Sequence, residues 1–202
     1  MKLHTSPFAP SPRRVRMYAA EKGIPLELVS VDIGANETQS PDFLQINPLG
    51  ETPVLECPDG RRLTESLAIC RYLDETHAGP DLWGHDAAER YEINRWIDRL
   101  MFRLYVPMTH VFRHGHAFWA GRIPQVAAYA EIARSQVLNE ISALESWMQG
   151  RDFMARDTFS MADIVGFTSL DFGKVVGVRV GPQWPHLERW YTAIRGRPSA
   201  SA

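Results

Sequence analysis

The sequence predicts an α/β domain at about residues 1–78, followed by an all-α domain at about residues 85–202. Three observations indicate this division. Strand-like and helix-like segments alternate in the first part, whereas apolar residues in the second part recur at helical spacing throughout. Between them, residues 79–84 contain two glycines and a proline, a composition typical of a linker. The 202 residues suffice for two small domains with separate cores.

The α/β domain is predicted to begin with a strand–helix–strand unit. Residues 1–4 form a short strand. The helix that follows is expected to have Ser11 as its N-cap and Pro12 at its first helical position, because serine and proline favour those places. Gly23 is expected to end this helix. Residues 26–31 alternate aliphatic and polar side chains, which predicts a second strand.

A hairpin and another helix complete this domain. A short helix is expected at residues 41–46, and the hairpin strands at 54–57 and 61–64. Asp59-Gly60 lies between these strands and is a strong hairpin signal. From residue 65 to about 77 the apolar residues return to helical spacing. The order βαβ followed by ββα is the thioredoxin-like order.

The second domain is predicted to be a helical bundle. Pro107 is expected to kink one of its helices, and Ser160 and Asp163 have the spacing of a capping box at the start of another. The expected helices are residues 87–104, 105–119, 124–148, a segment from residue 160, and 184–195.

The composition indicates a cytoplasmic protein without a nucleic-acid or membrane partner. The net charge is −2, and the basic run at residues 13–16 is expected to be a solvated helix face. Cys57 and Cys70 have no metal-ligand spacing and fit a reducing compartment, where they are expected to be buried and inert. No apolar run is long enough for a signal peptide or a membrane span.

Thr52-Pro53 stands directly before a predicted strand, where a proline needs an explanation because it cannot donate to a sheet ladder. A cis bond between these residues would turn the chain and leave the N–H and C=O of Thr52 pointing outward. Such a backbone pair can bind an extended peptide as an added strand does. The alternative is that Pro53 only begins an edge strand.

Glu65-Ser66 stands where a predicted strand runs into a helix. The N–H groups of a first helical turn bind carboxylates, and Ser66 adds a hydroxyl donor. Glu65 adds a negative charge that suits an ammonium group. Together they match the head of an α-amino acid. The alternative is simple capping, with Thr64 as N-cap and Glu65 as an acidic residue of the first turn.

In combination, these two motifs resemble the glutathione S-transferase superfamily, in its bacterial-type cytosolic form. Residues 43–50, which precede the proline, and residues 159–164, around the capping box, are also similar to the family's motifs, so the resemblance covers nearly the whole chain. It implies a glutathione S-transferase-like fold, with a thioredoxin-like α/β domain and an all-α helical domain. It also implies glutathione as co-substrate, no metal, and a homodimer.

The resemblance also implies roles for single residues. Thr52-Pro53 would pair with the cysteinyl backbone of glutathione, Glu65-Ser66 would hold its γ-glutamyl head, and Gln39 would reach its glycine end. Many relatives carry lysine and valine where this chain has Glu51 and Thr52. The backbone role of Thr52 survives this change, whereas a salt bridge from lysine to the glycine carboxylate does not.

Members of the family place a serine, cysteine or tyrosine near the start of the first helix to activate the thiol. Here Ala9 and Pro10 stand where the omega, theta and zeta classes carry their key residue, whereas Ser11 aligns with the beta-class cysteine. Ser11 is therefore the candidate catalytic residue, with Ser6 second. The absence of cysteine disfavours thiol exchange here. The alternative is that Ser11 only caps the helix.

Two further groups have less specific signals. Phe8, Tyr105, Met108 and Phe112, with Trp119, are expected to form an apolar pocket for a second substrate, or else to be core.

His110 and His114 form an i,i+4 pair that could face one metal, with His116 nearby. No acidic residue stands between them as in HExxH, so a polar helix end is the simpler interpretation.

The resemblance implies attack of the glutathione thiolate on a small apolar electrophile. The rival hypotheses are a non-catalytic protein of the same fold that binds ligands or partner proteins, and a glutathione-dependent isomerase, peroxidase or dehalogenase.

Overall fold

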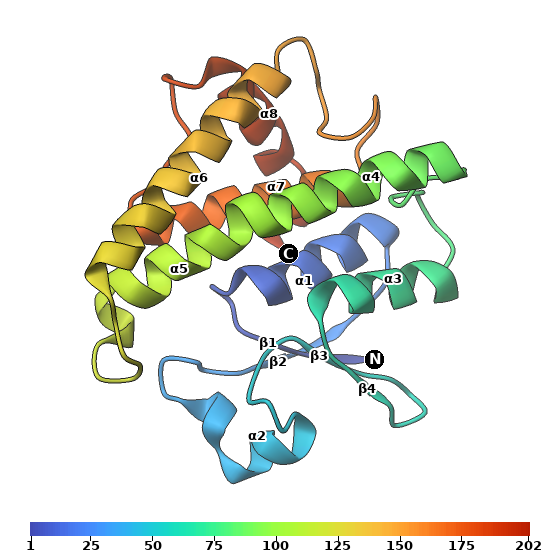
Figure 1. Ribbon diagram of the computed structural model, residues 1–202. Coiled ribbons are helices and arrows are strands. Elements are labelled where there is room, and N and C mark those ends of the chain that lie inside the picture. Colours follow the sequence, from blue (N-terminus) through green and yellow to red (C-terminus); the bar gives the residue numbers. More distant parts are fainter. The chain divides into compact units, whose positions relative to one another are not determined.

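The computed structural model describes residues 1–202, which divide into two compact units (Figure 1). The first unit comprises Met1–Pro80 together with Pro198–Ala202, and the second comprises Asp81–Arg197. The C-terminal residues were expected in the helical domain. They group with the first unit instead because helix α1 binds them: Arg13 donates to the carbonyl oxygen of Ala200 at 2.8 Å.

The first unit is built on a four-stranded mixed sheet with the order β2-β1-β3-β4. Strands β1 and β2 are parallel, whereas β3 is antiparallel to both β1 and β4. The predicted thioredoxin-like order is confirmed, and Asp59-Gly60 lies in the turn between the two hairpin strands. The strands are β1 (Lys2–Thr5), β2 (Glu27–Ser30), β3 (Val54–Glu56) and β4 (Arg62–Leu63).

Helices cover both faces of this sheet. Helices α1 (Pro10–Lys22) and α3 (Ser66–Thr76) lie side by side on one face, and α2 (Pro41–Ile46) lies on the other (Figure 1). Gly23 ends α1 with φ +68°, as predicted, because glycine adopts this left-handed conformation without strain. A short 3₁₀ turn, η1 (Glu37–Gln39), precedes α2.

The core of the first unit forms between the sheet and the α1–α3 pair. Leu3 pairs with Leu55 across β1 and β3, and both are fully buried. Ile69 and Leu73 stand four residues apart on α3, so they lie on one face of the helix, and both are fully buried. Truncating one such leucine to alanine costs about 2–5 kcal/mol of stability.

The second unit is entirely helical, with α7 at its centre. Residues 161–170 of α7 are all buried, which explains why this segment has little polar periodicity. The predicted capping box of Ser160 and Asp163 is present at its start. The helices are α4 (Ala87–Leu100), α5 (Val106–Gly115), α6 (Ala127–Trp147), α7 (Met161–Phe172) and α8 (Pro185–Arg195), with 3₁₀ turns η3 (Ala117–Trp119), η4 (Gly173–Val176) and, in the first unit, η5 (Pro198–Ser201).

The predicted irregularity near Pro107 takes the form of a π turn, η2 (Met101–Tyr105), between α4 and α5. The N–H of Val106 bonds to the carbonyl of Met101, five residues earlier. Pro107 has no N–H to continue the regular ladder, so the helix changes its hydrogen-bond pattern just before it. No helix of the protein has the length and apolar character needed to cross a membrane.

Candidate functional site

The strand directions bring three chain segments to one end of the sheet. Because β3 is antiparallel to both β1 and β4, the residues after β1, before β3 and after β4 all lie at the same end. These segments are the Ser6–Ala9 loop, Thr52-Pro53 and Glu65-Ser66. The two motifs singled out in the sequence are therefore neighbours in the first unit, with the start of α1 beside them.

The Thr52-Pro53 peptide bond is cis, as predicted. The loop that leads to it is held by Asn47, a buried residue whose amide donates to the carbonyl of Glu51 at 2.8 Å. Gly50 in this loop has φ +62°, and a Cβ there would lie 2.9 Å from the carbonyl oxygen of Thr38. Only glycine fits this position without strain.

Gln39 lies against the same loop. Its side-chain amide donates to the carbonyl of Gly50 at 3.4 Å, and the residue is otherwise exposed. The sequence prediction placed Gln39 near the glycine end of a bound peptide. In the structure it contacts Gly50, which stands two residues before Thr52 and the cis bond that would hold the middle of that peptide.

Glu65 and Ser66 form the start of α3. Glu65 is the N-cap residue but makes no side-chain capping bond, so the alternative with Thr64 as N-cap is wrong. The Glu65 side chain is exposed and its φ is +65°, which is unusual for a residue other than glycine. Ser66 is buried, and its hydroxyl oxygen accepts a bond from Arg14 at 3.2 Å. The first turn of α3 thus presents N–H groups that no side chain caps, suited to an anion.

Ser11 is the second residue of α1, and the N-cap is Ala9. The prediction that Ser11 caps this helix is therefore wrong, because Pro10, not Pro12, takes the first helical position. Pro10 and Pro12 have no N–H, so Ser11 supplies the only backbone donor among the first three residues of α1. Ser6, the second candidate, is buried in the preceding loop.

The predicted residues of a second-substrate pocket divide between the two units. Phe8 belongs to the first unit and is 90% exposed. Tyr105, Met108 and Phe112 belong to the second, where Met108 is fully buried and the other two are half-buried. Phe112 joins an aromatic cluster and packs edge-on against Phe172 with ring centres 5.3 Å apart. Their role in a pocket stays a prediction.

Histidines at the C-terminal end of α5 hold the segment that leads to α6. Nδ1 of His114 accepts from the N–H of Val126 at 3.3 Å, and Nδ1 of His116 accepts from the N–H of Phe118 at 3.1 Å. Both rings are therefore acceptors at Nδ1, which leaves any proton on Nε2. Burial is the largest cause that lowers the pKa of His110, and the charges of His114 and Arg113 lower it further.

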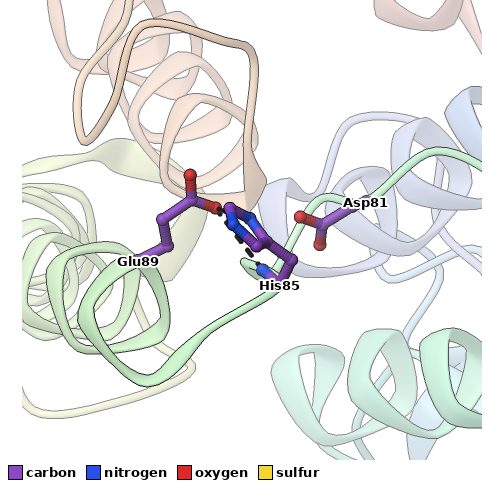
Figure 2. Close-up of side chains that lie close together, drawn as sticks. All are labelled: Asp81, His85 and Glu89. Atoms are coloured by element: carbon purple, nitrogen blue, oxygen red, sulfur yellow. Dashed lines mark hydrogen bonds and ion pairs between the residues drawn. The ribbon is translucent and has the colours of Figure 1, made fainter.

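A cluster that no sequence pattern had indicated lies at the start of the second unit. Asp81, His85 and Glu89 each offer a ligand atom, and these atoms lie within 4.8 Å of one another (Figure 2). Nδ1 of His85 lies 2.9 Å from Glu89 Oε2. The spacing of four residues between successive members is a signal that could have been noticed, although both Asp81 and His85 precede α4.

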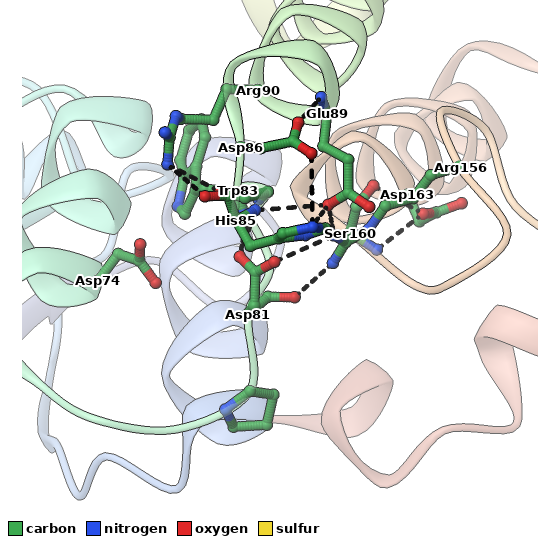
Figure 3. A network of polar contacts seen from close by, with 12 residues as sticks. Asp74, Asp81, Trp83, His85, Asp86, Glu89, Arg90, Arg156, Ser160 and Asp163 are labelled. Atoms are coloured by element: carbon green, nitrogen blue, oxygen red, sulfur yellow. Dashed lines mark hydrogen bonds and ion pairs between the residues drawn. The ribbon is translucent and has the colours of Figure 1, made fainter.

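The two carboxylates of this cluster are paired with the guanidinium group of Arg156. Arg156 contacts Asp81 Oδ2 at 3.0 Å, donates to the Asp81 carbonyl at 2.6 Å, and also pairs with Glu89 (Figure 3). Burial opposes ionisation of Asp81, but hydrogen bonds from Arg156 and from the N–H of Gly84 and Trp83 lower its pKa. The cluster is an ion-pair network that ties the start of the second unit to the segment before α7.

The basic run of α1 is not a solvated face. Arg14 is 1% exposed and Arg16 is 8% exposed, and only Arg13 is half-buried. The expectation from the sequence is wrong here because the oxygens that accept from these guanidinium groups come from distant parts of the chain.

Comparison with known proteins agrees with this geometry. Residues 5–76 match the family model "Glutathione S-transferase, N-terminal domain", and residues 100–198 match "Glutathione S-transferase, C-terminal domain". The chain is 31% identical to Glutathione S-transferase 2 of Saccharomyces cerevisiae, over 98% of this chain and 87% of that protein. It is similar to the crystal structure of Gtt2 from Saccharomyces cerevisiae, with a TM-score of 0.91, 30% identity and 98% of each chain covered.

Not every relative is named as a transferase. The chain is 27% identical to Probable elongation factor 1-gamma 1 of Arabidopsis thaliana, over 98% of this chain but only 47% of that protein. Fold, motifs and family models nevertheless agree along nearly the whole length, and this chain belongs to the glutathione S-transferase superfamily.

Proposed function

We propose that the protein is a glutathione transferase that conjugates the thiolate of glutathione to a small apolar electrophile. One observation carries the proposal: the sheet brings the cis Thr52-Pro53 bond and the start of α3 at Glu65-Ser66 to the same end. Family membership supports it. A cytoplasmic homodimer is part of the proposal, carried over from the family.

Glutathione would lie across this end of the sheet. The N–H and C=O of Thr52 would pair with its cysteinyl backbone, as a strand edge pairs with an added strand. The γ-glutamyl carboxylate would accept from the Ser66 hydroxyl and from the first turn of α3. Its ammonium group would lie near Glu65, and its glycine end near Gln39.

Activation of the thiol is the chemical task of the proposed site. The thiolate is the nucleophile, so a donor that stabilises it raises reactivity at neutral pH. Ser11 is the candidate donor. The thiol proton leaves to solvent, the sulfur forms a bond to the electrophilic carbon, and the group displaced from that carbon leaves with the bonding electron pair.

The rival function is ligand or partner binding without catalysis. Ala9 and Pro10 stand where several classes carry their activating residue, and relatives named elongation factor 1-gamma share the fold. A glutathione-dependent isomerase, peroxidase or dehalogenase would use the same binding half of the site.

Calorimetry with glutathione tests the binding half. Ser66→Ala should weaken binding about tenfold because the ligand carboxylate loses a hydrogen bond to an uncharged donor, worth about 1.5 kcal/mol. Ser142→Ala, an exposed serine of α6, is the matched control and should leave binding unchanged. Equal affinities for all three proteins would refute the assignment.

Turnover on a panel of aryl halides, peroxides and maleyl compounds separates the chemical alternatives. Wild-type conjugation that falls in Ser11→Ala supports a catalytic Ser11. Binding of glutathione without turnover of any panel member favours the rival, non-catalytic function.

A further inference from the structure

Two buried arginines of α1 donate hydrogen bonds to segments of the proposed site. Both side chains are buried although they are charged, Arg14 almost completely. A guanidinium that loses its hydration needs acceptors, because an unsatisfied buried charge is costly. Where these acceptors lie therefore shows which parts of the chain each arginine holds in place.

Arg16 holds the loop that follows β1. Its guanidinium donates to the carbonyl of Ser6 at 3.2 Å, to the carbonyl of Pro7 at 3.2 Å, and to the hydroxyl of Thr5. Its Nε donates to the carbonyl of Ala202 at 3.0 Å. Within the loop itself, the backbone bond is the long one from Ala9 N–H to Ser6, at 3.4 Å. Arg16 thus supplies two of the hydrogen bonds that hold this loop, to the carbonyls of Ser6 and Pro7, and a third to Thr5 at the end of β1.

Arg14 holds the serine at the start of α3. Its guanidinium donates to the Ser66 hydroxyl oxygen at 3.2 Å. A guanidinium has no acceptor, so Ser66 must accept this bond, and its own hydrogen is available to donate in another direction. Arg14 thereby fixes Ser66 in the role of a donor toward a carboxylate.

The strand order places the loop held by Arg16 and the serine held by Arg14 on opposite sides of Thr52-Pro53. Across the sheet end, the segment after β1, the Thr52-Pro53 bond before β3 and the start of α3 after β4 follow one another in that order. A peptide bound at Thr52 therefore has the Arg16-supported loop on one side and the Arg14-supported Ser66 on the other.

We propose that Arg14 and Arg16 are positioning residues for the two ends of the site, Arg14 for Ser66 at the γ-glutamyl head and Arg16 for the Ser6–Ala9 loop beside the thiol. This inference rests on the proposed function. It assigns the two arginines to different measurable steps: Arg14 to glutathione affinity, and Arg16 to thiol activation.

The test compares Arg14→Lys and Arg16→Lys with the wild type. Lysine keeps the charge but cannot reproduce the planar fork of donors. Three quantities are measured: the Kd for glutathione, kcat at saturating glutathione, and the pKa of the bound thiol from thiolate absorbance near 240 nm, a probe of thiolate chemistry. Arg13→Lys is the matched control, because Arg13 lies on the same helix and contacts Ala200.

Arg14→Lys should raise Kd about tenfold and leave the thiol pKa unchanged. Arg16→Lys should lower kcat about tenfold and raise the thiol pKa by roughly one unit, with Kd within about twofold, since one pKa unit and one decade of rate correspond to the same free energy. Thr5→Val removes one acceptor of Arg16. It should lower kcat and raise the thiol pKa, as Arg16→Lys does, but by a smaller amount. This variant covers the case in which Arg16→Lys does not fold.

Equal changes in both lysine variants, or no change beyond that of Arg13→Lys, would overturn the inference while leaving the proposed function standing. A wild-type protein that binds no glutathione would overturn both. The two failures are thus distinguished by the wild-type measurement.

Discussion

Asp163 joins three parts of the helical unit, so replacing it by asparagine is a sharp test of the packing. Its carboxylate accepts from the N–H and hydroxyl of Ser160 at 2.9 and 3.1 Å, from the N–H of Met154 at 2.9 Å, and from Trp190 Nε1 at 2.9 Å. An amide keeps one acceptor oxygen. The Ser160 hydroxyl can turn to accept from the new NH₂ group, but at least one buried N–H is left facing another donor.

The expected loss for Asp163→Asn is about 2–3 kcal/mol in the free energy of unfolding at pH 7.5, where the carboxyl group is ionised, since an orphaned buried donor costs about 1–3 kcal/mol. The loss also depends on pH. Burial raises the pKa of Asp163 to about 6, although its four hydrogen bonds act to lower it. An unfolded aspartate has a pKa near 3.9. Between these values the folded state binds a proton that the unfolded state releases.

Stability from this carboxyl is therefore fully present below about pH 4 and declines as pH rises through 6. The asparagine variant has no such dependence. The stability gap between wild type and Asp163→Asn should narrow by roughly 1–3 kcal/mol from pH 4.5 to pH 7.5. Other titrating groups are common to both proteins and cancel in the difference.

Urea unfolding, monitored by tryptophan fluorescence, measures this stability gap. The signal reports on the unit that contains Asp163, because all six tryptophans lie in the helical unit. Asp157→Asn changes an exposed carboxylate on the loop before α7, and should cost less than about 0.5 kcal/mol at either pH. A gap that widens as pH rises would refute the reasoning, because it would mean that hydrogen bonding outweighs burial and lowers the folded pKa of Asp163.

Two other substitutions and one labelling experiment follow from the same contacts. Arg156→Met should lower the urea midpoint by about 0.5 M at pH 7. This effect should disappear as pH falls below about 4, because the paired carboxylates of Asp81 and Glu89 have lowered pKa values and stabilise the fold only while ionised. Arg103→Met, at an exposed arginine, is the control and should leave the urea midpoint unchanged. Burial raises the pKa of Cys70 despite the nearby charge of Arg14, and Cys57 is also buried. Less than about a tenth of the total thiol should therefore react with a disulfide reagent in the native protein within minutes. Rapid native labelling would contradict this.

Local chemistry made much of the fold predictable from the sequence. The bounds of α2, residues 41–46, follow from a proline at its start, and the Asp59-Gly60 turn follows from glycine's tolerance of positive φ. The Ser160 capping box is likewise a relation between residues three apart. A proline directly before a strand left a cis bond and a plain strand start open, and the structure has the cis Thr52-Pro53 bond.

The features that could not be predicted depend on partners far along the chain. Arg14 meets Ser66 across 52 residues, and Arg156 meets Asp81 across 75. No periodicity distinguishes such an arginine from one on a solvated helix face. The predicted start of α1 was wrong for a different reason. Pro10 and Pro12 both suit a first helical position, and propensity alone does not choose between them.

Glu65 offers a final test, in which stability and binding should change in opposite directions. Its φ of +65° is costly for any residue with a side chain, and such conformations concentrate at functional sites. Glu65→Gly should relieve about 1–3 kcal/mol of strain, less about 0.5–1 kcal/mol for the greater freedom of the unfolded chain. The net gain of roughly 1 kcal/mol should appear as slower amide exchange in α3.

Glu65→Ala is the matched variant, because it removes the same carboxylate but keeps the strained backbone. Under the proposed function both variants lose the partner of the γ-glutamyl ammonium, so both should bind glutathione more weakly, while only the glycine variant becomes more stable. If Glu65→Gly is no more stable than Glu65→Ala, the backbone at Glu65 is not strained. If both bind glutathione as wild type does, the side chain has no part in the site, and the head group must be held by Ser66 and the α3 backbone alone.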